Sequence, residues 1–146
     1  MTMLIARETP RALLNNLKTW LESKDSTTIT GSLMVAVNGM DPPIAEPNTT
    51  IRAVAMSVDY QQAASPRSLY ARLMVRCYVE HPDGSHDFDE LQELAGRVAE
   101  SICRYPASHG DVVTADVDSG ASIQFDGGRA YAYVVLLLTV PTTNDI

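Results

Sequence analysis

The spacing of hydrophobic residues near the start of the chain predicts an amphipathic helix. Residues 9–24 read TPRALLNNLKTWLESK, and their apolar positions recur every three or four residues, which places on one helical face Leu13, Leu14, Leu17, Trp20 and Leu21. Thr9 suits the N-cap, and Pro10 suits the first helical position, where no backbone donor is needed. We therefore expect a first helix that packs one face against a core.

A second helix is expected after the turn-like sequence HPDGSH. Asp87, followed three residues later by Glu90, resembles a capping box, and the neighbouring acidic residues suit the positive start of a helix. Pro106 ends the helix. Its buried stripe is predicted to consist of Leu91, Leu94, Val98 and Ile102.

Alternation with a period of two predicts strands in the first half of the chain. Residues 31–39 read as a short strand, and residues 40–50 as a stiff, exposed, proline-rich loop. Residues 51–60 and 68–80 are two extended segments joined by the turn-like residues 61–67. The second segment is predicted to place on one face Leu73, Val75, Cys77 and Val79, and on the other Arg72, Met74, Arg76 and Tyr78.

Three more strands are predicted after the second helix, at residues 111–117, 121–126 and 129–141, with DSG and DGGR as tight turns between them. The whole order is α-β-β-β-α-β-β-β in one domain spanning residues 1–146. Because the turns within each strand group are short, we expect an α+β fold with a mostly antiparallel sheet of about five to six strands and both helices on one face.

The last strand is apolar on both of its faces, in the sequence RAYAYVVLLLTVP. One face carries Ala132, Val134, Leu136 and Leu138, and the other carries Tyr131, Tyr133, Val135 and Leu137. An antiparallel sheet with one wet face normally alternates, so a second cover is expected, either another subunit or an internally closed sheet. Aromatic residues and arginine are enriched at interfaces, and the interface candidates are Tyr70, Arg72, Tyr78, Arg129, Tyr131, Tyr133, Val135 and Leu137.

Charge narrows the possible partners. The net charge is −7, and it is uneven: residues 1–75 carry seven Lys or Arg against six Asp or Glu, whereas residues 76–146 carry four against twelve. Tight binding of nucleic acid needs cationic groups, so any role near DNA is expected to be one in which DNA does not adhere. The N-terminus has too brief an apolar run, and no basic start, for a secretory signal, and a cytoplasmic origin is expected.

No group of residues predicts catalysis or a cofactor. His81 and His86 lie among carboxylates, but their spacing matches neither a zinc nor a calcium motif, and the segment reads as a solvated turn and helix cap. Cys77 and Cys103 read as small buried residues. His109 reads as a loop residue, no serine has a nucleophile-elbow pattern, and the late carboxylates give only weak support for paired acid–base catalysis: Asp111, Asp116, Asp118 and Asp126.

Several features together resemble the tail-terminator (tail-completion) proteins of long-tailed bacteriophages, over nearly the whole chain. They are the N-terminal amphipathic helix, a proline-bearing loop after the first strand, the strand LYARLMVRCYVE followed by the helix LQELAGRVAESI, and the closing strand AYAYVVLLLTVP. The resemblance implies a non-enzymatic virion protein without a cofactor, located in the neck region of the tail and assembled in the host cytoplasm. Such a subunit forms a sixfold ring that caps the tail tube, stops its growth and receives the neck.

The implied partners are further copies of the chain, the tail tube protein and a head–tail connector or stopper protein. DNA would pass through the lumen without specific binding, and no membrane is involved. Lumen charges that would repel DNA are expected among Asp83, Asp87, Asp89, Asp116, Asp118 and Asp126. Stiff loop contacts to a neighbour are expected from Pro42, Pro43, Ile44 and Pro47.

Two alternatives remain open on the sequence. The first is another neck protein, such as a head-completion or stopper subunit. The second belongs to a different class: a small oligomeric α/β enzyme or ligand-binding module, with a site between subunits near His81, His86 and the late aspartates.

Overall fold

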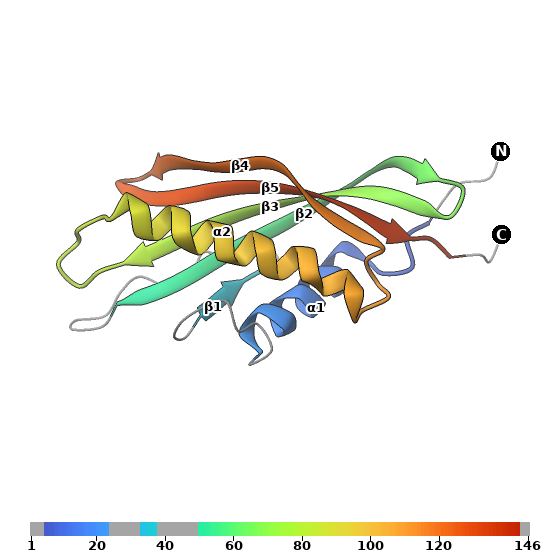
Figure 1. The fold of residues 1–146 in the computed structure, drawn as a ribbon, viewed down its shortest axis with the longest axis horizontal. Helices are drawn as coiled ribbons and strands as arrows, with labels where there is room; N and C mark the ends of the chain where they lie inside the picture. Colours follow the sequence, from blue (N-terminus) through green and yellow to red (C-terminus); the bar gives the residue numbers. More distant parts are fainter. Residues whose placement is uncertain (1–4, 24–32, 38–49, 144–146) are drawn as a thin grey trace.

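The computed structural model describes residues 5–23, 33–37 and 50–143, and Figure 1 shows their arrangement. The elements in chain order are α1 (Pro10–Glu22), β1 (Leu33–Ala36), β2 (Ile51–Ser65), β3 (Ser68–Glu80), α2 (Phe88–Arg104), the 3-10 helix η1 (Tyr105–Ala107), β4 (Thr114–Asp126) and β5 (Arg129–Pro141).

The strands form one five-stranded sheet in the order β1-β2-β3-β5-β4 within the described ranges. The pairs β2–β3, β3–β5 and β4–β5 are antiparallel, whereas the short β1 runs parallel to β2. Both helices cover the same face of the sheet (Figure 1). The predicted α+β fold is therefore confirmed, with five strands, the lower of the two numbers expected.

The main core lies between the helices and this face. It joins the apolar stripes of α1 and α2 to alternate residues of the strands, and the side chains of Leu13, Leu73, Leu136 and Leu138 are 0% exposed. The alternation predicted for β3 is confirmed, because Leu73, Val75, Cys77 and Val79 all belong to this cluster. The sheet face away from the helices is called the outer face below.

Both helices begin with the N-cap residues that the sequence predicts, but the capping box expected at α2 is incomplete. The Thr9 hydroxyl accepts a hydrogen bond from the Ala12 N–H at 3.2 Å, and the Asp87 carboxylate accepts from the N–H groups of Asp89 and Glu90. The Glu90 side chain does not return to Asp87 as a capping box requires. It pairs instead with the His81 ring at 3.0 Å, which fixes the end of β3 against the start of α2.

The prediction of three strands after α2 is wrong, because residues 114–126 form a single strand, β4. The DSG sequence does not reverse the chain. Its extra residues are absorbed by two register shifts against β5, between Val117 and Ser119 and between Ser119 and Ser122. Such bulges place small or polar residues in a strand without ending it. The DGGR turn is confirmed, with Gly127 at φ 60° and Gly128 at φ 80°, a conformation that favours glycine.

The turn predicted at residues 61–67 is also shorter than expected. β2 continues to Ser65 and β3 begins at Ser68, so only Pro66 and Arg67 form the turn. Register shifts after Tyr60 and after Ala63 again accommodate the extra residues. The result is a hairpin that extends past the helical layer at the end of the molecule where β5 ends (Figure 1).

Candidate functional site

The eight interface candidates from the sequence all alternate onto the outer face of β3 and β5. The register pairs Tyr70 with Thr139, Arg72 with Leu137 and Arg76 with Tyr133, and none of these residues shares the helix-covered parity of Leu73 or Leu136. Their exposure differs. Arg72 is exposed and Tyr78 and Val135 are buried, at 3% and 1%; the remaining five are half-buried: Tyr70, Arg129, Tyr131, Tyr133 and Leu137.

The outer face has a side-chain layer of its own. Ala53, Ala55 and Tyr78 form a small buried cluster there, against which Tyr131 packs. The Arg129 guanidinium lies 4.5 Å from the centre of the Tyr78 ring and also pairs with the Glu80 carboxylate. Placing small alanines beneath large rings lets the rings lie over the sheet.

Rings and cations continue along this layer. The rings of Tyr78 and Tyr131 are 5.5 Å apart, and the Arg76 guanidinium lies 5.9 Å from the Tyr131 ring. Burial raises the pKa of Tyr78, partly opposed by the positive charges of Arg76 and Arg129. Cation–π contacts hold these long side chains in place, so the layer presents a pre-ordered aromatic and arginine surface.

The six predicted lumen carboxylates are all exposed, but they do not lie together. Asp83, Asp87 and Asp89 belong to the β3–α2 loop and the first turn of α2, and Asp126 lies at the β4–β5 turn beside them (Figure 1). Asp116 and Asp118 lie in the first half of β4, away from this end. Only the first four could contribute to a single charged surface.

An aromatic cluster that the sequence did not predict lies at the same end of the molecule. The centre of the Phe125 ring lies 6.0 Å from that of the Phe88 ring and 6.5 Å from that of the His86 ring, and both pairs are packed edge to face. Phe88 is 47% and Phe125 60% exposed. The pairing joins residues far apart in the chain, so no local pattern indicates it.

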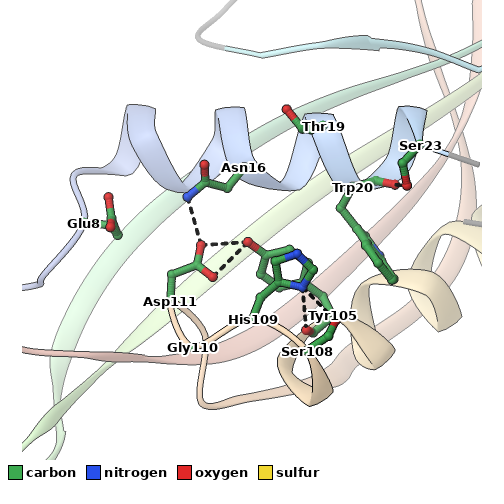
Figure 2. Close-up of a pocket in the computed structure, with 10 residues that line it drawn as sticks. All are labelled: Glu8, Asn16, Thr19, Trp20, Ser23, Tyr105, Ser108, His109, Gly110 and Asp111. Atoms are coloured by element: carbon green, nitrogen blue, oxygen red, sulfur yellow. Dashed lines mark hydrogen bonds between the residues drawn. The ribbon is translucent and has the colours of Figure 1, made fainter. Parts of the chain in front are cut away.

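A polar and aromatic cavity of about 670 Å³ lies between α1 and the link from η1 to β4 (Figure 2). The Tyr105 hydroxyl donates to the Asp111 carboxylate at 2.8 Å, and the Asn16 amide donates to the same group at 3.0 Å. The Trp20 indole N–H donates to the Ser101 carbonyl, and the His109 ring stacks on Tyr105 at 4.2 Å. These contacts connect α1 to the end of α2.

The pKa values of two phenol groups are raised here: that of Tyr105, which lines the cavity, and that of Tyr60, which is close to Glu8 and Asp111. Burial raises the pKa of Tyr105, as do the hydrogen bond and the negative charge from Asp111. Burial and the nearby Glu8 and Asp111 carboxylates raise the pKa of Tyr60 to about 12. Since Asp111 already accepts two hydrogen bonds and His109 Nδ1 lies 2.8 Å from the Ser108 hydroxyl, the polar groups of the cavity serve to join elements. The sequence predicts Trp20 on the apolar face of a helix and His109 in a loop. Neither prediction indicates that the two rings pack against each other.

The remaining candidate residues are placed as follows. Cys77 is fully buried, which raises its pKa to about 12, and Cys103 is half-buried with a raised pKa. His81 pairs with Glu90, whereas His86 joins the phenylalanines. Within residues 5–23, 33–37 and 50–143, no three His, Cys, Asp or Glu side chains gather as metal ligands. The loop candidates Pro42, Pro43, Ile44 and Pro47 lie outside the described residues.

Neither helix of the described segments is long and apolar enough to cross a membrane. In comparisons with known proteins, no family model matches the chain and no curated protein matches its sequence. A function therefore has to be inferred from the fold and from these surfaces.

Proposed function

We propose that this protein is a structural subunit of a long-tailed bacteriophage. It assembles as a ring on the head-proximal end of the tail tube, stops tube growth and forms the joining surface for the neck. The proposal joins the resemblance of the sequence to tail terminators with a fold that has helices on one sheet face only.

One observation carries the proposal: the outer face presents a half-buried aromatic and aliphatic surface bordered by arginines. Tyr131, Tyr133 and Leu137 remain partly accessible on β5, and Arg72 is exposed beside them on β3. Apolar surface that a chain leaves accessible in one continuous region is typical of a contact with another molecule. A neighbouring subunit would cover this face and complete the burial of β5.

The charge of the chain supports the same role. Each subunit carries a net charge of −7, so a ring of several copies is strongly anionic as a whole. Carboxylates that face the lumen would repel DNA and leave it free to pass.

Imaging tests the proposal directly. Purified protein is mixed with tail tubes that lack their head-proximal cap and is examined by negative-stain electron microscopy. We expect a ring at the head-proximal tube end, together with tubes that no longer elongate when tube protein is added. Binding along the tube sides, or no binding at all, would contradict the proposal, and attachment only to the head side of the neck would favour a stopper or head-completion protein.

Two matched substitutions test whether ring formation depends on the outer face. Tyr133→Glu places a charge on the half-buried face and should abolish ring formation while the monomer stays folded. Val113→Glu, at a residue that is 54% exposed beside β4, is the matched control and should leave rings intact. Loss of rings in both variants would point to charge alone as the cause.

The cavity beside Trp20 favours a second candidate, a ligand-binding module of another class. Its volume suits a small molecule, and its lining combines aromatic rings with carboxylate and hydroxyl groups (Figure 2). Thermal unfolding with a panel of metabolites distinguishes the two, because a ligand that binds the folded state raises the melting temperature. A large shift, absent in Trp20→Ala, would favour this candidate.

A further inference from the structure

The two phenylalanines of the chain are in an unusual place. The sequence contains only these two, and both are largely exposed at one end of the molecule. Phenylalanine is among the residues most often buried, and a single exposed ring needs no explanation, but two that pack on each other form a continuous apolar surface. We call Phe88, Phe125 and the adjoining His86 the aromatic tip.

The aromatic tip is held in shape by regular structure on both sides. Phe88 is the first residue of α2, behind the Asp87 N-cap, and Phe125 is the penultimate residue of β4, next to the tight Gly127–Gly128 turn. Rings fixed in this way lose little conformational entropy when a partner covers them. The tip therefore has the properties of a preformed contact.

The charge around the tip indicates what it contacts. The same end of the molecule carries four exposed carboxylates. Asp83, Asp87 and Asp89 lie in the β3–α2 loop and the start of α2, and Asp126 follows Phe125 in the chain and shares the outer face with Arg129. None of the four takes part in an ion pair within the described part of the chain. A complementary partner surface would carry exposed, unpaired arginines beside an apolar side chain.

Residues of these kinds lie at the opposite end of the same chain. The Arg7 N–H donates to the Pro141 carbonyl at 2.9 Å, and the Arg67 carbonyl accepts from the Thr142 N–H at 3.0 Å, so both arginines border the end of β5. Both are exposed, and neither has an ion-pair partner among the described residues. Ile5, 57% exposed, accepts from the Thr143 N–H beside them. We call Ile5, Arg7 and Arg67 the basic end.

We propose that the aromatic tip of one copy docks on the basic end of the next copy, in a head-to-tail contact between subunits. The carboxylates at the tip then face the next copy, and of the six lumen candidates only Asp116 and Asp118 on β4 stay outside this contact. The elements that carry them lie at opposite ends of the long axis in Figure 1: the β3–α2 loop and the β4–β5 turn at one end, and the β2–β3 hairpin and the end of β5 at the other. They are different patches, so the contact is heterologous, and a pair of copies keeps one free basic end and one free aromatic tip. Heterologous contacts close into rings when the rotation between copies permits it, and otherwise form open chains. The inference rests on the proposed function for the closed ring, whereas the contact itself can be tested alone.

Charge reversal tests the contact in the full chain. One variant carries Asp89→Arg with Asp126→Arg at the tip, and a second carries Arg7→Glu with Arg67→Glu at the basic end. Sedimentation velocity at low ionic strength should show association of the wild type and, because like charges now meet, at least roughly tenfold weaker self-association of each variant. An equimolar mixture of the two variants should associate again, since each reversed patch then meets its complement.

Two further variants separate this contact from general effects. Phe88→Ser with Phe125→Ser keeps every charge and should also weaken association. Glu100→Arg with Asp118→Arg reverses two exposed carboxylates away from the tip and should associate like the wild type. Circular dichroism establishes that each variant is folded, and if a charge variant is not, the phenylalanine pair takes its place.

Several results would overturn the inference. They are a wild type that stays monomeric at every concentration, a tip or basic-end variant that associates normally, or a variant mixture that does not associate. Tube imaging separates this from the proposed function. Copies that associate through the two ends but never bind tail tubes would overturn the function and keep the contact. Rings that cap tubes even when the tip is reversed would overturn the contact and keep the function.

Discussion

The two faces of the sheet enclose apolar groups by different means. The helix-covered face buries branched aliphatic side chains, such as Leu73, Leu136 and Leu138, against two amphipathic helices. The outer face instead places tyrosine rings over alanines and arginines beside the rings, and leaves much of that layer accessible. The helix-covered face forms the core that stabilises the fold. The outer face has an ordered side-chain layer that remains accessible to water and can be covered by another subunit. Substitutions that differ only in the face they affect test this difference.

Two adjacent leucines on β5 should show the largest contrast. Leu136→Ala removes a side chain that is 0% exposed in the core and should lower the free energy of unfolding by about 3–5 kcal/mol. Leu137→Ala, on the half-buried outer face, should cost about 1 kcal/mol in the monomer. Urea denaturation measures both, and equal losses would mean that the outer face is as much a core as the inner one.

Removal of the arginine charge from the outer layer should have a smaller effect. Arg129→Met keeps much of the side-chain stem but leaves the half-buried Glu80 carboxylate without this partner, and should cost about 1–2 kcal/mol. Arg97→Met disrupts the exposed pair with Glu93 on α2 and should cost less than about 0.5 kcal/mol. Indistinguishable urea midpoints for the two variants would contradict the view that the outer layer is pre-ordered.

Removal of the Tyr105 hydroxyl, which helps to connect α1 to the end of α2, should lower the stability slightly less. Tyr105→Phe keeps the buried ring and removes the hydrogen bond to Asp111, for an expected loss of about 1 kcal/mol. Tyr70→Phe on the outer face is the control, and a change near zero is expected in thermal unfolding. A larger loss of stability in Tyr70→Phe than in Tyr105→Phe would contradict this prediction.

The last contrast should appear only in alkali. The pKa of Tyr60 is raised from 10.0 to about 12 in the folded chain, so the folded state retains its proton where the unfolded state loses it. This contribution to stability is complete below pH 10.0 and is lost as the pH rises toward about 12. Urea midpoints across this range should fall less steeply for Tyr60→Phe than for the wild type, and parallel curves would contradict the assignment.

Features that depend on neighbouring residues were predictable from the sequence. The cap at Thr9, the stripe of α2, the alternation of β3 and the Gly127–Gly128 turn each follow from a few adjacent positions. The continuity of β4 was not, because DSG has the composition of a turn and only pairing with β5 keeps it extended. Local composition therefore overstated the number of chain reversals.

The candidate surfaces divide in the same way. Parity alone places Tyr131 and Tyr133 on the outer face, but not the near-complete burial of Val135 there, which depends on how the neighbouring strands are arranged. The contact of Phe88 with Phe125 and that of Trp20 with Tyr105 join residues from distant parts of the chain. Contacts between such distant residues can be predicted only after the order of the strands is known.

The two bulges in β4 also affect the behaviour of the protein at high local concentration. β4 ends the sheet on one side, and a regular border strand offers a row of unsatisfied amide and carbonyl groups on which a stray strand can grow. The displaced residues around Ser119 break that row into short pieces. Many copies can therefore accumulate side by side without fusing into an endless cross-β fibre.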